Sequence, residues 1–343
     1  MGCRLTPLVT PLRIGLAGVT GRTLAVDALN AIYQFLALVR TGSGDFLRNR
    51  KGYVTSHLVG MASRYSKLAA DNACRFIFVF DGPPHPLKRA ELERRERVRE
   101  RALEEYKLAL LSGNLEKALS KAVVAIRVDQ WIIESSKKLV TLMGFPVVDA
   151  PSDAEAQAAF IVARGDAWAV SSQDWDSLLY GADRLVRYLT LTGFEWLPSK
   201  QVARKLEPEL VELGKLLNTL GLTRKQLVEV AVLSGTDYNR PVRGIGPLKA
   251  YKLIKLYGSL EKLPSNLRKQ LPENYEDIVN LFLHPRVKED YEIDFREPRV
   301  EELYRFLVDE NDFSPERART IISRLQRSRE TLRAHQRTID EYN

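Results

Sequence analysis

Residues 150–179 read APSDAEAQAAFIVARGDAWAVSSQDWDSLL and carry two pairs of acids separated by an apolar segment. The apolar segment predicts a helix that leads into a short strand. Asp153 and Glu155 then lie at the positive end of a helix, where carboxylates are favoured. Asp174 and Asp176 follow the strand in a loop, and ligands of open α/β sheets gather beyond the carboxyl ends of strands. The alternative for either pair alone is a helix cap or an ordinary polar loop.

The local signals in this stretch give boundaries for the helix and the strand. Ser152 or Asp153 is suited to cap a helix that begins near Ala154. Residues 167–171 form the strand-like run. Four carboxylates brought together would repel one another unless a cation lay among them, so the placement of both pairs predicts a metal site.

Two further strands are expected to end in an acid. Residues 23–26 form a short apolar run that ends at Asp27, and residues 30–39 have helical spacing. Residues 76–80, FIFVF, predict a buried strand that ends at Asp81 in a Gly-Pro-Pro turn. Further expected elements are helices over 55–70, 130–143, 225–234 and 248–257, strands over 147–148 and 184–190, and a loop over 41–51.

The composition predicts a basic intracellular protein. The 343 residues include 52 Lys+Arg and 44 Asp+Glu, for a net charge of +8 and a pI near 9.3. A polyanionic partner such as nucleic acid is therefore expected. Two cysteines, Cys3 and Cys74, make no disulfide framework. The chain lacks a signal-peptide pattern and a run of about 20 apolar residues, so we expect a cytoplasmic protein that does not enter the membrane.

A charge run at residues 88–101, KRAELERRERVRER, has seven basic and four acidic residues and high helix propensity. A solvated helix with i,i+4 ion pairs is the ordinary interpretation. Because the run begins seven residues after Asp81, phosphate capture is the alternative. Residues 107–128 predict a second helix with a break at 112–114, so residues 86–128 are expected to form an arch or lid over a site.

Residues 235–258, GTDYNRPVRGIGPLKAYKLIKLYG, connect two predicted helices. Gly244 and Gly246 precede a proline at the first helical position, and Lys249 and Lys252 follow. Exposed backbone N–H groups at such a helix start bind phosphate without reading bases. This helix–hairpin–helix pattern predicts a duplex-binding module, and a plain packing unit is the alternative.

Acids, rather than histidines, supply the candidate metal ligands. Carboxylate ligation selects Mg²⁺ or Mn²⁺ over zinc, and two-metal phosphoryl chemistry needs no nucleophilic Ser or Cys. The candidate ligands are Asp27, Asp81, Asp153, Glu155, Asp174, Asp176 and Asp237.

Over nearly its whole length, the sequence resembles the archaeal flap endonucleases of the 5′-nuclease superfamily. The matching motifs, in order, are AVDALNAIYQFL, TSHLVGM, VFDGPPHPLK, APSDAEAQAA, SSQDWDSLLYG and SGTDYNRPVRGIGPLKAYKLI. The resemblance implies a PIN-like α/β core with a mostly parallel sheet flanked by helices, a helical arch and a helix–two-turn–helix module. It implies Mg²⁺-dependent 5′-flap endonuclease activity, with 5′–3′ exonuclease activity, on branched DNA such as double flaps in replication and repair.

The resemblance also assigns residue roles and regions. The seven acids match the metal-binding positions, although relatives often have Glu where this chain has Asp153. The remaining matched residues are Lys88 and Arg95 for the scissile phosphate, Tyr33 for base stacking, Gly244, Gly246, Lys249 and Lys252 for duplex DNA, and Thr55, Phe313 and Arg317 for a 3′ flap. The implied regions are an N-terminal nuclease region (1–105), the arch (86–128), an internal region (129–258) with the hairpin module (225–258), a C-terminal helical region (259–330) and a tail (331–343).

Three positions depart from the family pattern. Pro241 stands where relatives often use a Ser to help hold K⁺, so K⁺ binding here would depend on backbone carbonyls. The tail is expected to be flexible and matches the motif for a sliding clamp (PCNA) at Gln336, Ile339 and Tyr342, but it ends in Asn343 where an aromatic is usual. The N-terminus matches the family start only loosely.

Two alternatives to a monomeric flap nuclease remain open at this point. One is an RNA-directed nuclease of the PIN-like class, although such proteins are usually shorter and lack both the arch and the hairpin module. The other is a non-enzymatic DNA clamp, which would bind junctions without metal-dependent turnover.

Overall fold

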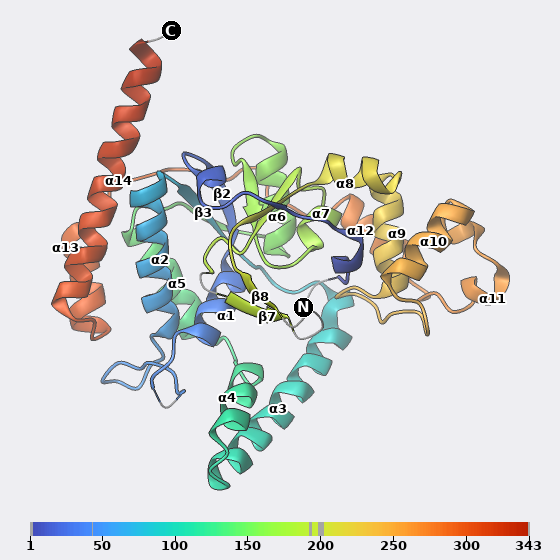
Figure 1. The fold of residues 1–343 in the computed structure, drawn as a ribbon, viewed down its shortest axis with the longest axis horizontal. Helices are drawn as coiled ribbons and strands as arrows, with labels where there is room; N and C mark the ends of the chain where they lie inside the picture. The colour runs from blue at the N-terminus through green and yellow to red at the C-terminus, as the bar shows by residue number, and fades with distance from the viewer. Residues whose placement is uncertain (1–2, 43, 192–193, 198–201, 342–343) are drawn as a thin grey trace.

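The computed structural model describes residues 3–42, 44–191, 194–197 and 202–341, with a seven-stranded mixed sheet at its centre (Figure 1). β2 (Thr23–Asp27) pairs in parallel with β3 (Arg75–Phe80) and β5 (Ala169–Ser171), and parallel pairing continues to β4 (Val147–Asp149) and β6 (Arg184–Arg187). The expected mostly parallel α/β sheet is confirmed, with an antiparallel edge that was not expected. In spatial order the strands are β1 (Leu12–Arg13), β9 (Glu209–Glu212), β6 (Arg184–Arg187), β5 (Ala169–Ser171), β2 (Thr23–Asp27), β3 (Arg75–Phe80) and β4 (Val147–Asp149).

The parallel strands end at a common edge. Asp27 lies opposite Val79 on β3, and Val26 lies opposite Ser171 on β5. The residues that follow these three strands therefore leave the sheet on the same side. This edge faces the helical hairpin of α3 (Arg89–Leu111) and α4 (Leu115–Val124) in Figure 1.

Alternate side chains of the central strands pack into two separate cores. Phe76 and Phe78 of β3 face one core, and Ile77 and Val79 face the other. All four are fully buried, as the period of two in a strand requires when both sheet faces are covered. The Tyr65 ring packs edge-on against both phenylalanines, with centroid distances of 4.8 and 4.9 Å.

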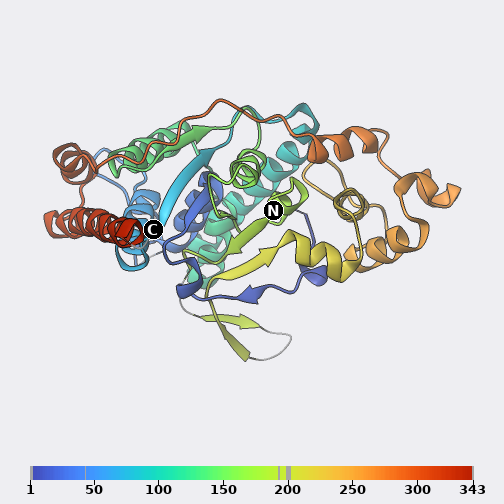
Figure 2. The same ribbon diagram turned by 90° about the horizontal axis from the view of Figure 1, so that it is seen from above.

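Helices cover both faces of the sheet. The face of Phe76 and Phe78 is covered by α1 (Ala28–Leu38), α2 (Ser56–Asn72), α5 (Gln130–Leu142), α13 (Val300–Arg305) and α14 (Pro315–Glu341). The opposite face is covered by α6 (Ala154–Ala163), α7 (Asp176–Leu179), α8 (Leu213–Leu220), α9 (Arg224–Ser234), α10 (Pro247–Tyr257) and α12 (Tyr275–Leu283). The helix-rich segment around α10 and α11 (Ser265–Arg268) lies at the opposite end of the molecule from α14 (Figure 2).

The charge run forms part of a long helical hairpin. α3 (Arg89–Leu111) and α4 (Leu115–Val124) pack against each other and project from the sheet (Figure 1). The expected break at 112–114 is confirmed. The prediction of separate helices over 88–101 and 107–128 is wrong. The first helix, α3, continues through residues 102–106, because these contain no Gly or Pro that would end it.

Smaller elements complete the described chain. β7 (Phe194–Leu197) and β8 (Val202–Lys205) form a separate antiparallel pair that projects from the core in Figure 2. The 3₁₀ helices are η1 (Thr6–Leu8), η2 (Ala17–Val19), η3 (Pro86–Lys88) and η4 (Leu260–Lys262), and η5 (Phe306–Glu310) is a π-helix. Within the described residues, no helix has the length and apolar character needed to cross a membrane.

Residues 336–341 of the expected tail are helical. They continue α14 to Glu341, since no Gly or Pro follows Pro315 to stop the helix. Gln336 and Ile339 lie on this helix, but their side chains are outside the description, and Tyr342 lies outside the described residues.

His57 gives a prediction about acid stability. It is fully buried in α2, its Nε2 lies 2.9 Å from Ser135 Oγ on α5, and burial lowers its pKa to about 3. Between about pH 3 and the ordinary pKa of 6.5, His57 is protonated in the unfolded chain but stays neutral in the folded chain. The free energy of unfolding therefore falls as the pH falls through this window. His57 should contribute about 2–3 kcal/mol of this fall between pH 6.5 and 4.5.

Denaturant unfolding of wild type and His57→Gln at several pH values measures this contribution. The stability difference between the two proteins is expected to shift in favour of the variant as the pH is lowered. Parallel curves over the whole range would contradict the buried neutral histidine.

Candidate active site

A cavity of about 410 Å³ lies between the common strand edge and the α3–α4 hairpin, and we call it the central hollow. Five of the seven candidate acids line it, together with Tyr33 and both candidate phosphate-binding bases. Charges of both signs thus meet in one hollow at the carboxyl ends of the strands. Its charged lining residues are Asp27, Asp81, Lys88, Arg94, Arg95, Arg99, Glu155, Asp174 and Asp237.

Two of these acids also organise the helices beside them. Asp27 caps α1, because its Oδ1 accepts a hydrogen bond from Asn30 N at 3.0 Å. Asp81 reaches across from the end of β3, and its Oδ1 accepts from Ala154 N at 2.8 Å. The α6 boundary at Ala154 is as expected and Asp153 occupies the N-cap position, but its side chain makes no capping hydrogen bond, because the carboxylate that accepts from Ala154 N comes from the end of β3.

Mutual repulsion and burial raise the proton affinity of the acids. Burial, and then the charge of Asp81, raise the pKa of Asp27 to about 7. Burial and the charges of Asp176, Asp27 and Asp174 raise the pKa of Glu155 well above its ordinary value. The acids therefore lie close enough together for strong electrostatic repulsion, although they are far apart along the chain.

Basic side chains from α3 offset part of this negative charge. Arg95 Nη2 donates to Asp237 Oδ1 at 2.6 Å, and its Nε donates to Glu91 Oε1 at 3.0 Å. Arg99 Nη2 donates to the hydroxyl of Tyr33 at 2.9 Å. The base of the hairpin is thus tied to the acids and to α1.

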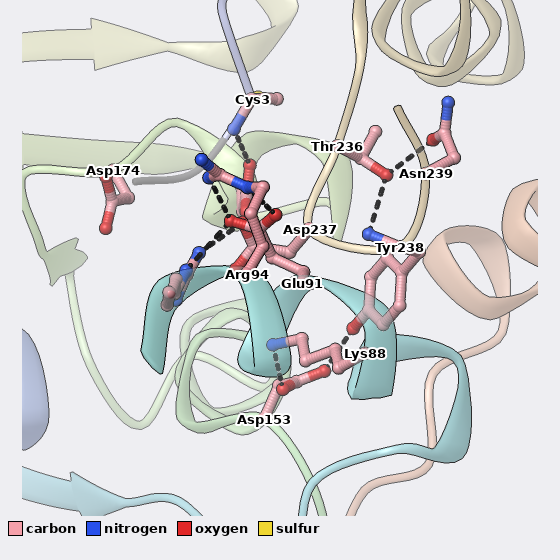
Figure 3. Close-up of polar contacts among 12 residues, drawn as sticks. Cys3, Lys88, Glu91, Arg94, Asp153, Asp174, Thr236, Asp237, Tyr238 and Asn239 are labelled. Atoms are coloured by element: carbon pink, nitrogen blue, oxygen red, sulfur yellow. Dashed lines mark hydrogen bonds and ion pairs between the residues drawn. The ribbon is translucent and has the colours of Figure 1, made fainter. Parts of the chain in front are cut away.

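Asp176 and Asp153 differ from the other five acids. Asp176 begins α7 instead of lying in a loop, and its Oδ1 accepts from Cys3 N at 2.6 Å. Asp153 pairs with Lys88 and accepts from Tyr238, as Figure 3 shows, and it also accepts from the hydroxyl of Tyr180. Neither acid lines the central hollow, and the metal-ligand roles expected for them stay predictions.

The donor chemistry of the hollow fits a hard divalent cation. The acids offer carboxylate oxygens, and Glu155 Oε1 is buried without a hydrogen-bond partner among the described residues. In the same part of the chain, no three His, Cys, Asp or Glu side chains stand in the geometry that holds an ion. Asp237 is paired with Arg95, and the seven ligand assignments stay predictions.

Several residues of the site were missed in the sequence. Asn30 Nδ2 donates to Asp174 Oδ2 at 3.2 Å, and Asn30 Oδ1 accepts from Gln173 N at 3.0 Å. Its position three residues after Asp27, on the first turn of a helix, was the available signal. Tyr180 and Tyr238 had no comparable signal, because their hydroxyls meet at Asp153 from distant parts of the chain.

The predicted DNA-contacting residues divide by exposure. Gly244, Gly246, Lys249 and Lys252 lie on the surface around the loop between α9 and α10 and are accessible to a ligand. Thr55 and Phe313 are 4% and 5% exposed, so little of either side chain reaches the surface, and their roles at a 3′ flap stay predictions. Arg317 is exposed near the start of α14.

Comparison of the sequence with known proteins shows which family the chain belongs to. The model of the XPG N-terminal domain matches residues 8–102, and that of the XPG I-region matches residues 144–237. Flap endonuclease 1 of Hyperthermus butylicus is 42% identical over 348 residues, covering 100% of this chain and 99% of that protein. The chain belongs to the XPG family of flap endonucleases.

Other flap endonucleases agree with this assignment. The flap endonuclease 1 of Archaeoglobus fulgidus is 42% identical over 342 residues and covers 100% of both chains. The solved flap endonuclease-1 from Methanococcus jannaschii has a TM-score of 0.74 and 36% identity, covering 94% of this chain and 98% of that one. The family resemblance and the α/β fold expected from the sequence are thereby confirmed.

Gly82 decides how closely the Asp81 loop approaches α6. A Cβ at Gly82 would lie 2.2 Å from the carbonyl oxygen of Ala150, and Gly82 N donates to Ser152 O at 2.7 Å. Gly82→Ala is therefore expected to destabilise the protein by about 1–3 kcal/mol, because backbone must move to make room. Denaturant unfolding measures the effect.

Gly214→Ala is the matched control for Gly82→Ala. Gly214 lies in α8 and has open space where its Cβ would be. This substitution is expected to stabilise the protein by about 0.5–1 kcal/mol, because it removes backbone entropy from the unfolded chain. Destabilisation of equal size by both substitutions would contradict the close approach at Gly82.

Proposed function

We propose that this protein cleaves 5′ flaps where single-stranded DNA meets a duplex, by metal-dependent phosphodiester hydrolysis, and that the same site removes nucleotides from 5′ ends. The observation that carries the proposal is the meeting of five acids with Lys88 and Arg95 in one hollow beneath a helical hairpin. Membership of the flap endonuclease family supports the same reaction.

Each part of the central hollow has a role in this proposal. Mg²⁺, as two ions for which Mn²⁺ can substitute, would be held by the carboxylates and would supply positive charge that activates water and stabilises the leaving oxygen. Lys88 and Arg95 stabilise negative charge on the scissile phosphate. Tyr33 stacks on the base next to the cut. The α3–α4 hairpin admits a single strand and excludes a duplex.

The surfaces around the hollow position the DNA. Backbone N–H groups near Gly244 and Gly246, with the lysines of α10, grip the duplex backbone and so set the cutting distance. Backbone carbonyls of the same loop, which contains Pro241, are proposed to hold K⁺. Arg317 contacts a 3′ flap. The terminal residues Gln336, Ile339 and Tyr342 bind the sliding clamp.

A labelled double-flap DNA tests the proposed function. Full-length protein is expected to release the flap in Mg²⁺ and to leave it intact in EDTA. An RNA-directed nuclease would cut single-stranded RNA in preference to the flap. A non-enzymatic clamp would bind the junction and release nothing in either condition.

Lys249 and Lys252 give a prediction about salt dependence. Both lie exposed on α10, so replacing either by Ala should remove one phosphate contact and lower the slope of log affinity against log salt by about 0.9. Lys255→Ala is the matched control, because Lys255 Nζ donates to the carbonyls of Leu220 and Gly221 at 3.0 and 2.7 Å, whereas the contact of Lys249 Nζ with Gly244 O is longer, at 3.3 Å, and lies in the hairpin loop itself. An equal change in slope for all three variants would remove this face from the DNA-binding surface.

A further inference from the structure

We propose that the edge of the sheet opposite the central hollow binds an acidic peptide segment of a partner protein. A cavity of about 510 Å³, which we call the back hollow, lies at the amino ends of four neighbouring parallel strands, β6, β5, β2 and β3. Four arginines against two aspartates give its lining a net positive charge. These charged lining residues are Arg22, Arg75, Arg164, Arg184, Asp166 and Asp183.

Every arginine of the back hollow lies over an aromatic ring. A guanidinium group that stacks on a ring is restricted in orientation, and its N–H groups point outward around its edge. Such a fork is preorganised to pair with an anionic group through two parallel hydrogen bonds. The distances from guanidinium carbon to ring centroid are 5.2 Å for Arg22 on Trp168, 5.9 Å for Arg184 on Trp168, 5.1 Å for Arg75 on Phe295 and 5.4 Å for Arg164 on Tyr291.

Three of these arginines have no carboxylate partner within the described part of the chain. The side chains of Arg22 and Arg75 are exposed and make neither a hydrogen bond nor an ion pair there. Arg184 makes one long hydrogen bond, from Nη1 to a backbone carbonyl at 3.4 Å. Arg164 differs, because its Nε lies 3.8 Å from Asp166 Oδ2. The back hollow therefore offers oriented guanidinium groups that the carboxylates of an acidic ligand would pair.

The ring contacts favour a peptide over a single strand of nucleic acid. Proteins that bind a single strand without reading its sequence stack its bases on aromatic faces. Trp168, the aromatic residue in the lining, is half-buried and already has two guanidinium groups over its ring. Asp166 and Asp183 would repel a continuous phosphate backbone, whereas a peptide can place its own N–H groups opposite them.

The back hollow is separate from the proposed DNA-binding face. β2 begins at Thr23, which lines the back hollow, and ends at Asp27, which lines the central hollow. At about 3.3 Å per residue, these two positions are roughly 13 Å apart along the strand. The back hollow lies on the side of the sheet away from the α3–α4 hairpin in Figure 1. A partner bound there would leave the central hollow open to its substrate, so the inference does not depend on the cleavage reaction.

Binding of a labelled acidic peptide tests the proposal. Fluorescence anisotropy of a fluorescein-labelled peptide of alternating Asp and Gly is followed at low salt as full-length protein is added. Arg22→Lys combined with Arg75→Lys keeps the charge but loses both planar forks, so this double variant is expected to bind the peptide about tenfold more weakly. Attraction by net charge alone predicts equal binding by wild type and double variant. That result, or no binding by wild type up to about 1 mM protein, would overturn the proposal.

Lys249→Ala combined with Lys252→Ala is the matched control on the proposed DNA-binding face. This variant loses two positive charges, but both lie on α10, away from the back hollow. Its affinity for the peptide is expected to stay within about twofold of wild type at fixed salt, because exposed charges farther apart than about 10 Å are largely screened. A loss as large as that of the arginine variant would place the peptide on the DNA-binding face instead.

A thymidine oligonucleotide in place of the peptide separates the two classes of ligand. Its affinity should be equal for wild type and for the arginine double variant. A greater loss for the oligonucleotide than for the peptide would make the back hollow a nucleic-acid site and contradict the proposal.

Flap cleavage provides the last readout. The arginine double variant should cleave at the wild-type rate, and slower cleavage with an unchanged melting temperature would make these arginines part of the DNA-binding surface. Arg22→Lys alone, with an expected loss of about threefold in peptide affinity, keeps the test decisive if the double variant does not fold.

Discussion

Glu155→Gln is expected to slow flap cleavage by about 10³-fold or more and, at the same time, to raise the melting temperature of the metal-free protein. Glu155 carries a buried oxygen with no hydrogen-bond partner among the described residues and faces the charges of Asp176, Asp27 and Asp174. Gln keeps the shape but removes a charged oxygen that a divalent cation would need. A 10³-fold loss corresponds to about 4 kcal/mol of transition-state stabilisation.

The stability gain has the same electrostatic origin. In EDTA at pH 8, Lys88, the arginines of α3 and a few hydrogen-bond donors offset only part of the repulsion among these acids, so loss of one charge relieves it. Thermal unfolding in EDTA and in Mg²⁺ measures this effect. Mg²⁺ should raise the melting temperature of wild type, because it binds the folded state only, and should raise that of Glu155→Gln much less.

Glu229→Gln is the matched control. Glu229 is 2% exposed on α9, away from the hollow, and burial raises its pKa to about 7. At pH 8 its replacement should also raise the melting temperature, but flap cleavage should stay at the wild-type rate. Near-normal cleavage by Glu155→Gln, or a lower melting temperature in EDTA, would count against the metal assignment.

Arg95→Ala is expected to slow cleavage by about 10²–10³-fold while flap affinity changes only a few-fold. Arg95 bridges Glu91 on its own helix and Asp237 at the edge of the hollow, and its side chain is 23% exposed. It is placed to meet charge that develops on a phosphate, which is where a preorganised guanidinium contributes most. Single-turnover rates and binding isotherms on one flap substrate separate the two effects.

Two further variants define what Arg95 contributes. Arg95→Lys keeps the charge but loses the planar fork, so it should fall between wild type and Arg95→Ala. Arg89 lies on the same helix, its side chain is 85% exposed, and it pairs with Glu93. The Arg89→Ala variant should therefore cleave at the wild-type rate. A loss in affinity that accounts for the whole defect of Arg95→Ala would make Arg95 a binding residue instead.

Much of the site could be predicted because its acids occupy recognisable local positions. Asp27 and Asp81 each end an apolar strand, and parallel strands bring such ends to one edge. The partners of these acids could not be predicted in the same way. Asp81 caps α6 although 73 residues separate it from Ala154, and local capping rules therefore pointed to the wrong side chain.

The sequence by itself determined the five parallel strands of the sheet, the helices α1, α2, α5, α6, α9 and α10, and the family, because local apolar patterns and ordered motifs are properties of neighbouring residues. Only the tertiary structure decided which way each acid turns. Asp27 and Glu155 face their fellow acids, Asp176 turns to Cys3, and Asp153 turns to Lys88 and two tyrosines. The reason is that a carboxylate's environment is set by the donors and charges that packing brings within a few ångströms, and those come from distant parts of the chain.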